Sequence, residues 1–286
     1  MKKGLIFSFI VLLETSCYDQ KTVEATFKFP VVQPKIVVNC IITPSDSIFA
    51  SVHKLLNVYD KSASFPNYND GINNASVILE NTTTSKKITL SFLSENGLYG
   101  NSQNNFKISP GANYRLTVLA PNYPTVIATC KVPEKAAVFD RFSYSEPYNA
   151  GTSINRRRVE GRWQGIVSSD SLYYGVNLVS QLQYNSEINS FSITEFSNNI
   201  TKSSNIYFYQ STATNNQFPK IYTLLTAEKN LYFYYVSSER IENITKSGTG
   251  DFFGAFQGII PEYTNIKNGY GVFGAFLGTK TKVLFK

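Results

Sequence analysis

The sequence predicts a mainly β protein, with a β-sandwich in its first half and a second antiparallel β-rich domain with one or two helices behind it. The composition favours this fold class, because 19 Tyr, 21 Phe and many Asn, Ser and Thr residues suit strands joined by polar loops. Short apolar runs recur between turn residues, whereas helical spacing of apolar residues is scarce. At 286 residues, the chain is long enough for one large domain or two of medium size.

Residues 1–16 have the order of regions that is typical of a secretory signal peptide. Lys2 and Lys3 give a basic start, an apolar run follows over residues 4–13, and small residues precede Cys17. The apolar run is about half the length that a membrane-spanning helix needs. We therefore expect this segment to be removed on export.

Cys17 directly follows the expected cleavage point, an arrangement similar to the lipobox of bacterial lipoproteins. The residue is thus expected to be acylated, and residues 17–34 are expected to tether the protein to a membrane. Glu14 stands where a lipobox usually has an apolar residue, so an ordinary signal peptide is the alternative. Asp19 gives a weak acidic export signal, which favours the cell surface over the periplasmic face.

Residues 35–134 are predicted to form the sandwich domain. Polar residues over 59–74 indicate a long loop, Pro110-Gly111 marks a turn, and Val132-Pro133 closes the unit. Short apolar runs predict strands over 35–43, 48–56, 75–82, 86–93, 112–119 and 124–132.

Residues 135–286 are predicted to form the second domain, an antiparallel sheet or partial barrel. One segment differs from the strand pattern, because Leu231, Tyr234, Tyr235 and Ser238 follow each other at helical spacing. This spacing predicts a covering helix over 226–243, opening with Thr226. Strands are expected over 137–145, 157–167, 171–182, 187–196, 203–210 and 271–285.

Cys40 and Cys130 lie in two of the predicted strands. Alternation along each strand places both thiols on the apolar face. An exported protein can keep a disulfide, so these residues are candidates for a bridge. Free buried cysteines that pack as small hydrophobic residues are the alternative.

No pattern in the sequence carries catalytic or metal chemistry. His53 is the single histidine, which argues against a zinc site and leaves a Ser–His–Asp triad without a nucleophile motif. Gly269 to Gly274 spells a literal G-x-G-x-x-G, but dinucleotide binding needs a following helix in a βαβ unit. We expect a tight turn into an edge or terminal strand there. The sequence therefore predicts no enzymatic activity, no cofactor and no metal.

The formal charge of +7 is spread along the chain, apart from the triplet Arg156-Arg157-Arg158. A nucleic-acid-binding protein usually gathers basic residues on one face, so no nucleic-acid partner is expected. The triplet is interpreted as the solvated edge of a loop, with a phosphate or acidic partner as the alternative.

Ser47 and Ser171 each follow an Asp and precede an apolar residue. These triplets are similar to the O-glycosylation motif of exported Bacteroidetes proteins. Each also works as a turn entering a strand, so both interpretations stay open.

Several stretches, in order, resemble the domain-of-unknown-function 4249 family, a group of Bacteroidetes outer-membrane lipoproteins. The likeness begins at the lipoprotein signal and covers nearly the full length, with a divergent middle. Its motifs are Pro34 to Thr43, Asn74 to Leu79, Gly97 to Tyr99, Pro110 to Val118, Val132-Pro133 and Thr264 to Ala275.

The resemblance implies an immunoglobulin-like or carboxypeptidase-regulatory-like β-sandwich followed by a second β-rich domain. It also implies an outer-membrane location beside TonB-dependent transporters. It implies no established activity and no catalytic residues.

We therefore expect a non-enzymatic lipoprotein, anchored in the outer membrane, that serves nutrient uptake as an accessory or ligand-capture subunit of a TonB-dependent β-barrel transporter. The alternative is a surface adhesin or glycan-binding module. In either function, a small-molecule or glycan ligand of the protein would contact exposed tyrosines. The candidates are Tyr173, Tyr174, Tyr184, Tyr207, Tyr209, Tyr232, Tyr234 and Tyr235, of which about half are expected to face the core.

Overall fold

The computed structural model describes most of the chain from residue 34 onward. The predicted signal peptide and Cys17 lie outside the described residues, as do most of the loop predicted over 59–74 and residues 187–195 of a predicted strand. The described ranges are 34–44, 47–55, 71–94, 96–102, 106–145, 148–149, 155–166, 168–179, 196–198, 205–213, 220–246 and 263–283.

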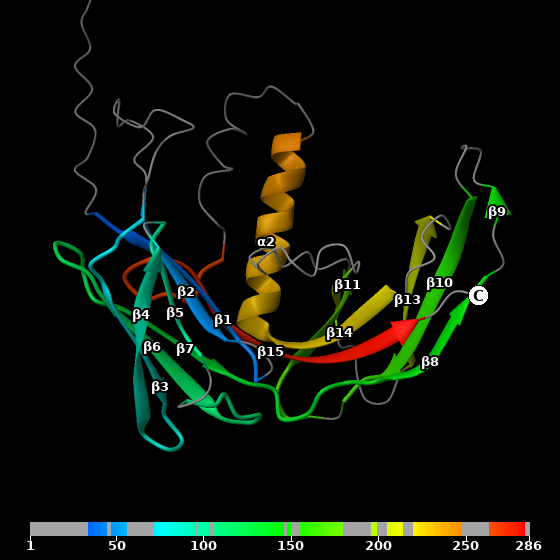
Figure 1. Cartoon of the computed structure of the whole chain (residues 1–286), viewed down its shortest axis with the longest axis horizontal. Coiled ribbons are helices and arrows are strands. Elements are labelled where there is room, and N and C mark those ends of the chain that lie inside the picture. The colour runs from blue at the N-terminus through cyan, green and yellow to red at the C-terminus, as the bar shows by residue number, and fades with distance from the viewer. Residues whose placement is uncertain are drawn as a thin grey trace, which may run out of the picture. The chain divides into compact units, whose positions relative to one another are not determined.

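The first half of the chain forms seven strands around one apolar core (Figure 1). Alternate residues of β1 are buried, so that Val38 and Cys40 face inward with their neighbours at i±2. Tyr99 and Tyr114 fill the same core. The strands are β1 (Ile36–Ile42), β2 (Ile48–Lys54), β3 (Ser76–Asn81), β4 (Lys86–Ser94), β5 (Leu98–Asn101), β6 (Asn113–Leu119) and β7 (Val126–Lys131).

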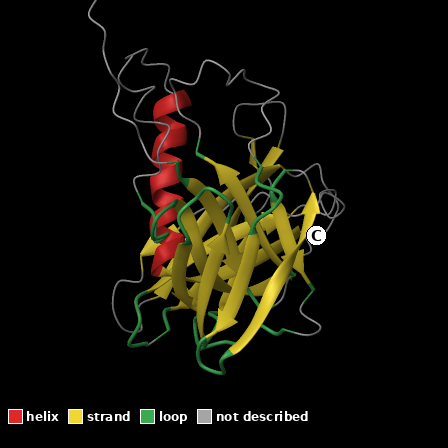
Figure 2. Ribbon diagram, turned by 90° about the vertical axis from the view of Figure 1, so that its left-hand side faces the viewer, coloured by secondary structure: helices red, strands yellow, loops and turns green. Residues whose placement is uncertain are grey.

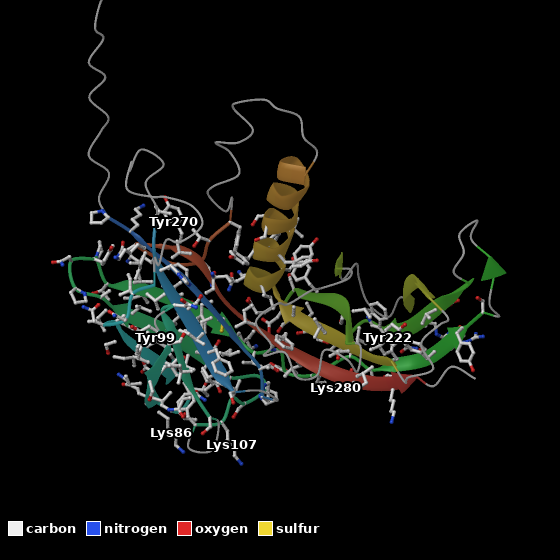
Figure 3. The ribbon with its side chains drawn as sticks, turned by 45° about the horizontal axis from the view of Figure 1, so that its top comes forward. Lys86, Tyr99, Lys107, Tyr222, Tyr270 and Lys280 are labelled. Carbon is white, nitrogen blue, oxygen red and sulfur yellow. The ribbon has the colours of Figure 1, made fainter. Side chains whose placement is uncertain are left out.

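The second half has its own core around Trp163, Tyr174 and Tyr222. Figure 3 labels Tyr99 in the first core and Tyr222 in the second. The elements are β8 (Phe139–Tyr144), β9 (Tyr148–Asn149), β10 (Asn155–Gln164), β11 (Leu172–Val179), β12 (Phe196–Asn198), β13 (Asn205–Ala213), β14 (Lys220–Glu228), α2 (Lys229–Lys246) and β15 (Tyr270–Val283).

Strand β15 joins the two halves into one sheet. It runs parallel to β1, with Val38 opposite Gly271, and antiparallel to β14, with Ala227 opposite Phe276. The resulting order is β12-β11-β14-β15-β1-β2-β5-β4-β3-β6-β7. A smaller sheet has the order β13-β10-β8, with β9 also paired to β10. The domain boundary between residues 134 and 135 stays a prediction. The register shows that β15, the last described strand, pairs with β1, the first strand of the predicted sandwich domain.

The glycines of the G-x-G-x-x-G segment let β15 fit between its neighbours. Gly271 has φ of +102°, and a Cβ there would overlap the carbonyl oxygen of Val38. A Cβ on Gly274 would lie 2.9 Å from the Cβ of Leu231 in α2. As predicted, a turn at Asn268 leads into β15, the last described strand, but this strand lies between β14 and β1 and not at an edge of the sheet. These glycines serve close backbone packing.

The mainly β fold class is confirmed, and most predicted strands lie within a few residues of their observed bounds. Three strands were missed, among them β9, which is only two residues long. β14 is buried along nearly its whole length, with Tyr222 and Leu224 in the second core and Leu225 and Ala227 beneath α2. A strand covered on both faces shows no alternation. β5 is only four residues long and contains a glycine.

The predicted start of the helix at Thr226 was wrong. Thr226 belongs to β14, where its Oγ1 accepts a hydrogen bond from the N–H of Ala137 at 2.9 Å. The helix begins at Lys229 because Glu228 caps it. Helix α2 packs against β15, β14 and β11, and Figure 2 shows it in red beside the strands. Among the described residues, no helix has the length and apolar character needed to span a membrane.

Candidate functional site

A cavity of about 560 Å³ lies where three parts of the fold meet. Its walls come from the ends of β6 and β7, from residues 169–172 before and at the start of β11, and from residues 228–230 at the junction of β14 and α2. Most of the lining side chains are polar, among them those of Asn113, Thr129, Ser171 and Asn230. Because these segments are distant in sequence, the cavity exists only in the folded chain.

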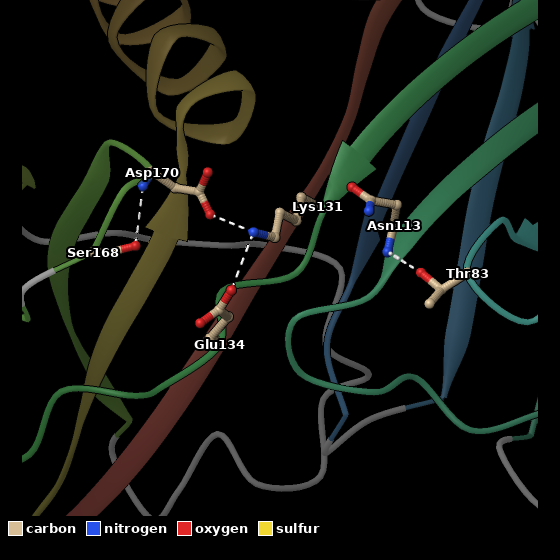
Figure 4. A network of polar contacts seen from close by, with 6 residues as sticks. All are labelled: Thr83, Asn113, Lys131, Glu134, Ser168 and Asp170. Carbon is tan, nitrogen blue, oxygen red and sulfur yellow. Dashed lines mark hydrogen bonds and ion pairs between the residues drawn. The ribbon is translucent and has the colours of Figure 1, made fainter.

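An ion-pair network forms one wall (Figure 4). The ammonium of Lys131 lies 2.6 Å from Oδ2 of Asp170 and 3.2 Å from Oε1 of Glu134. The backbone N–H of Asp170 donates to Oγ of Ser168 at 3.1 Å, which holds the loop before β11 in place. Hydrogen bonds to Asp170 and Glu134 raise the pKa of Lys131. Exposed pairs contribute little free energy, so the network chiefly positions β7 against the loop.

The turn between β3 and β4 forms another part of the wall. Oδ1 of Asn81 accepts hydrogen bonds from the N–H groups of Thr83 and Thr84, which shapes the turn. Oγ1 of Thr83 then accepts from the N–H of Asn113 at 3.2 Å, as Figure 4 shows. The hydroxyl of Thr82 donates to the carbonyl of Asn113 at 3.1 Å. These bonds fix the start of β6 at the cavity.

Glu228 is the buried carboxylate of the site, with 7% of its surface exposed. Its oxygens accept hydrogen bonds from the N–H groups of Asn230 at 2.9 Å and Leu231 at 3.0 Å, so it serves as the N-cap of α2. Burial raises the pKa of Glu228 to about 7, against the opposing effects of these backbone donors and of Lys229. The carboxylate in turn raises the pKa of the Cys130 thiol, after the larger effect of burial.

Asn230 connects the cavity to the segment before β15. The hydroxyl of Tyr263 donates to Oδ1 of Asn230 at 2.6 Å, and Nδ2 of Asn230 donates to the carbonyl of Thr129 at 3.4 Å. Nδ2 of Asn265 donates to the same carbonyl at 3.3 Å. Thr129 lies on β7, the last strand of the large sheet. The side-chain amides therefore act as hydrogen-bond donors to a carbonyl on the outer edge of that strand.

Four aromatic rings, which we call the aromatic rim, continue from the cavity wall. Tyr173 and Tyr232 stack with ring centroids 4.0 Å apart and an interplanar angle of 9°. Phe233 contacts both tyrosines and also Tyr263, whose ring centroid lies 5.5 Å away. Phe233 is 42% exposed. The rim therefore offers an apolar ring surface to solvent beside a polar cavity.

The predicted tyrosines are distributed among several environments. Tyr173 and Tyr232 belong to the rim, whereas Tyr174 is buried in the second core. Tyr234 and Tyr235 are half-buried on α2. Tyr184 lies outside the described residues, as do the side chains of Tyr207 and Tyr209. Phe233 and Asn230 were missed by sequence reasoning, although their i, i+3 spacing places them on one helix face.

Cys40 and Cys130 both face the first core, as alternation predicts. The structure holds them as free, buried thiols. Burial raises the pKa of Cys40 to about 12 and also raises that of Cys130. The disulfide itself stays a prediction. Ser47 is exposed just before β2, and Ser171 is exposed on the cavity wall, so both hydroxyls are accessible for the predicted glycosylation.

His53 lies in β2, where its backbone forms a bridge with Gly71. The arginine triplet, interpreted as a loop edge, lies instead at the start of β10, with Arg157 opposite Thr212 of β13. The long pairing of β10 with β13 extends the strand over all three arginines. Within the part of the chain that the structure describes, no group of three or more His, Cys, Asp or Glu residues is placed to hold a metal ion.

Comparison with protein-family models gives a match over most of the chain. The family model of the domain of unknown function 4249 matches residues 22–282, which includes both cores, α2 and every residue of the cavity and rim. No curated protein matches the chain.

Proposed function

Since this chain belongs to the domain-of-unknown-function 4249 family, we propose that it is a non-enzymatic, lipid-anchored outer-membrane protein that captures a ligand for a TonB-dependent transporter. The family description assigns no activity. The proposal therefore depends on the expected lipidation of Cys17, on the transporter association implied by the resemblance, and on the geometry of the cavity.

The cavity is the observation that carries ligand capture. Its volume of about 560 Å³ is in the range of small-molecule sites, and its walls come from strands and a capped helix that hold their shape. The charged groups on its wall engage one another or the backbone. Lys131 pairs with Asp170 and Glu134, and both oxygens of Glu228 cap α2.

The predicted tether is long enough for the protein to act beside a transporter. Residues 17–34, fully extended, would span roughly 60 Å. An acyl chain on Cys17 would hold the base of the tether in the membrane, and the β1 strand begins only two residues after its end. The folded part would then be able to reach over a neighbouring pore without leaving the membrane surface.

The test is affinity purification of the natively expressed full chain in a mild detergent. A TonB-dependent β-barrel protein should co-purify, and an unrelated outer-membrane lipoprotein purified in parallel should not recover it. Recovery of the chain without any such transporter would overturn the transporter role.

A surface adhesin is the second candidate, because the exposed ring of Phe233 offers a contact surface that needs no transporter. Cells that lack the protein would then lose attachment to a surface while keeping nutrient uptake. Loss of uptake with unchanged attachment would exclude the adhesin.

A further inference from the structure

The cavity and the aromatic rim form one continuous surface. Ser171 and Leu172 line the cavity where β11 begins, and Tyr173 is the next residue of that strand. Asn230 lines the cavity, and Phe233 follows it by one helical turn. Tyr263 contacts Phe233 with its ring and Asn230 with its hydroxyl. A ligand in the cavity would therefore meet the rim.

Positive and negative groups on the cavity wall balance one another. Lys131 is neutralised by Asp170 and Glu134, and the charge of the exposed Lys229 lowers the pKa of the neighbouring Glu228 carboxylate, against the larger effect of burial. The N-terminus of α2 already has the Glu228 carboxylate as its cap, so its N–H groups are not offered to an anion. The surface thus has no excess charge for an ionic ligand.

The strand edge at the cavity is also occupied. The carbonyl of Thr129 accepts from Asn230 and Asn265, and Ile127 exchanges backbone hydrogen bonds with Lys267. An extended peptide that adds to a sheet needs these backbone groups free. Strand addition along this part of β7 is therefore blocked.

What the surface does offer is a set of hydroxyl and amide groups beside flat rings. Exposed hydroxyls come from Thr129, Ser169 and Ser171, and the exposed Asn113 adds an amide. Sugars present hydroxyl groups along their edges and C–H groups on their faces, so they match a polar wall with an aromatic neighbour. We propose that the cavity and aromatic rim bind a neutral oligosaccharide, with one sugar ring against Phe233 and the adjoining sugar in the cavity.

This inference rests on the proposed ligand-capture function and names its ligand class. The test screens the full chain in detergent against an array of neutral oligosaccharides, with oligogalacturonates and unstructured peptides as comparison probes. The strongest neutral probe is then titrated calorimetrically. We expect binding that weakens about tenfold in Phe233→Ala, since an aromatic contact of this kind contributes about 1.4 kcal/mol. Phe233→Trp should keep the affinity.

Phe92→Ala is the matched control. Phe92 is also 42% exposed and also makes an edge contact with a tyrosine, Tyr99, but it lies on β4 in the first half. Fluorescence of Trp163, the single tryptophan, reports whether each variant keeps its fold. Absence of neutral-oligosaccharide binding at millimolar concentration would overturn the inference, as would equal affinity in Phe233→Ala or preferred binding of the acidic or peptide probes.

The two proposals fail separately. A co-purifying transporter without oligosaccharide binding removes the ligand class and leaves the transporter role. Oligosaccharide binding without a transporter keeps the ligand class and removes that role.

Discussion

Asn265 pairs with Phe273 through two reciprocal hydrogen bonds. Nδ2 of Asn265 donates to the carbonyl of Phe273 at 2.7 Å, and Oδ1 accepts from the N–H of the same residue at 2.9 Å. The amide also donates to the carbonyl of Thr129 on β7. One side chain thus connects β15, which lies inside the sheet, with β7 at its end.

Asn265→Ala should destabilise the fold by about 2–3 kcal/mol, because it removes the partners of the N–H and carbonyl of Phe273 and one of the two donors to the Thr129 carbonyl. The measurement is urea unfolding followed by Trp163 fluorescence. Asn122→Gly serves as the control, since Asn122 is exposed in a turn at φ of +67° and glycine tolerates that conformation. Equal stability of Asn265→Ala and wild type would show that the reciprocal bonds contribute nothing.

Gly271→Ala should cost about 4 kcal/mol or more, because the added Cβ meets the carbonyl of Val38 and the backbone has positive φ. Gly278→Ala on the same strand is the matched control. Its Cβ would lie 3.2 Å from Cγ2 of Thr223, a side-chain atom that can shift, so we expect a cost below about 1 kcal/mol. Thermal unfolding distinguishes the two, and similar losses in both variants would argue against the close β15–β1 approach.

The buried carboxylate of Glu228 predicts how stability varies with pH. Its pKa in the folded chain is about 7, above the ordinary value of 4.5, so the folded chain holds this proton more tightly than the unfolded chain. The resulting stabilisation is fully present below about pH 4.5 and is lost as the pH rises through about 7, a change of at most about 3 kcal/mol.

Urea unfolding measured across this pH range checks the prediction. Glu228→Gln should flatten the profile, and a His53→Gln background removes the single histidine from the titration. A profile that keeps its slope in Glu228→Gln would assign the pH dependence to another group.

Cys40 and Cys130 should resist alkylation in the folded protein at pH 8, because both thiols are buried and their raised pKa values keep them protonated. After denaturation without reductant, both should react, as peptide mass mapping would show. Peptides that stay linked until a reductant is added would instead establish the disulfide.

Cys17→Ser should abolish incorporation of a labelled fatty acid and move the protein from the detergent phase to the aqueous phase. Glu14→Leu restores the usual apolar residue of a lipobox and should keep or increase the labelling. Membrane partition unchanged in Cys17→Ser would show that something other than an acyl chain holds the protein.

Local patterns predicted the strands well where only one face is buried. Alternation over Ile36 to Ile42 located β1 and the inward direction of Cys40. The alternation pattern did not predict β14, because both faces of this strand are covered. The parallel pairing of β15 with β1 depends on contacts between distant residues, which a local pattern does not encode.

The site was only partly visible in the sequence. Ser171, Tyr173 and Tyr232 were singled out, and the structure brings all three to the cavity or its rim. Glu228 was not singled out as a site residue, because a carboxylate gives no sign of burial until the strand that carries it is placed. Asn230 and Phe233 were not predicted, because both contact Tyr263, which is distant in sequence and adjacent in space.

The β15–β1 pairing also sets the order in which the chain can fold. Because β15 is synthesised long after β1, one edge of β1 stays open until nearly the whole chain has been made. A nascent chain of this kind cannot complete its first sheet early. If the predicted signal peptide directs export, that delay would help to keep the chain unfolded during translocation.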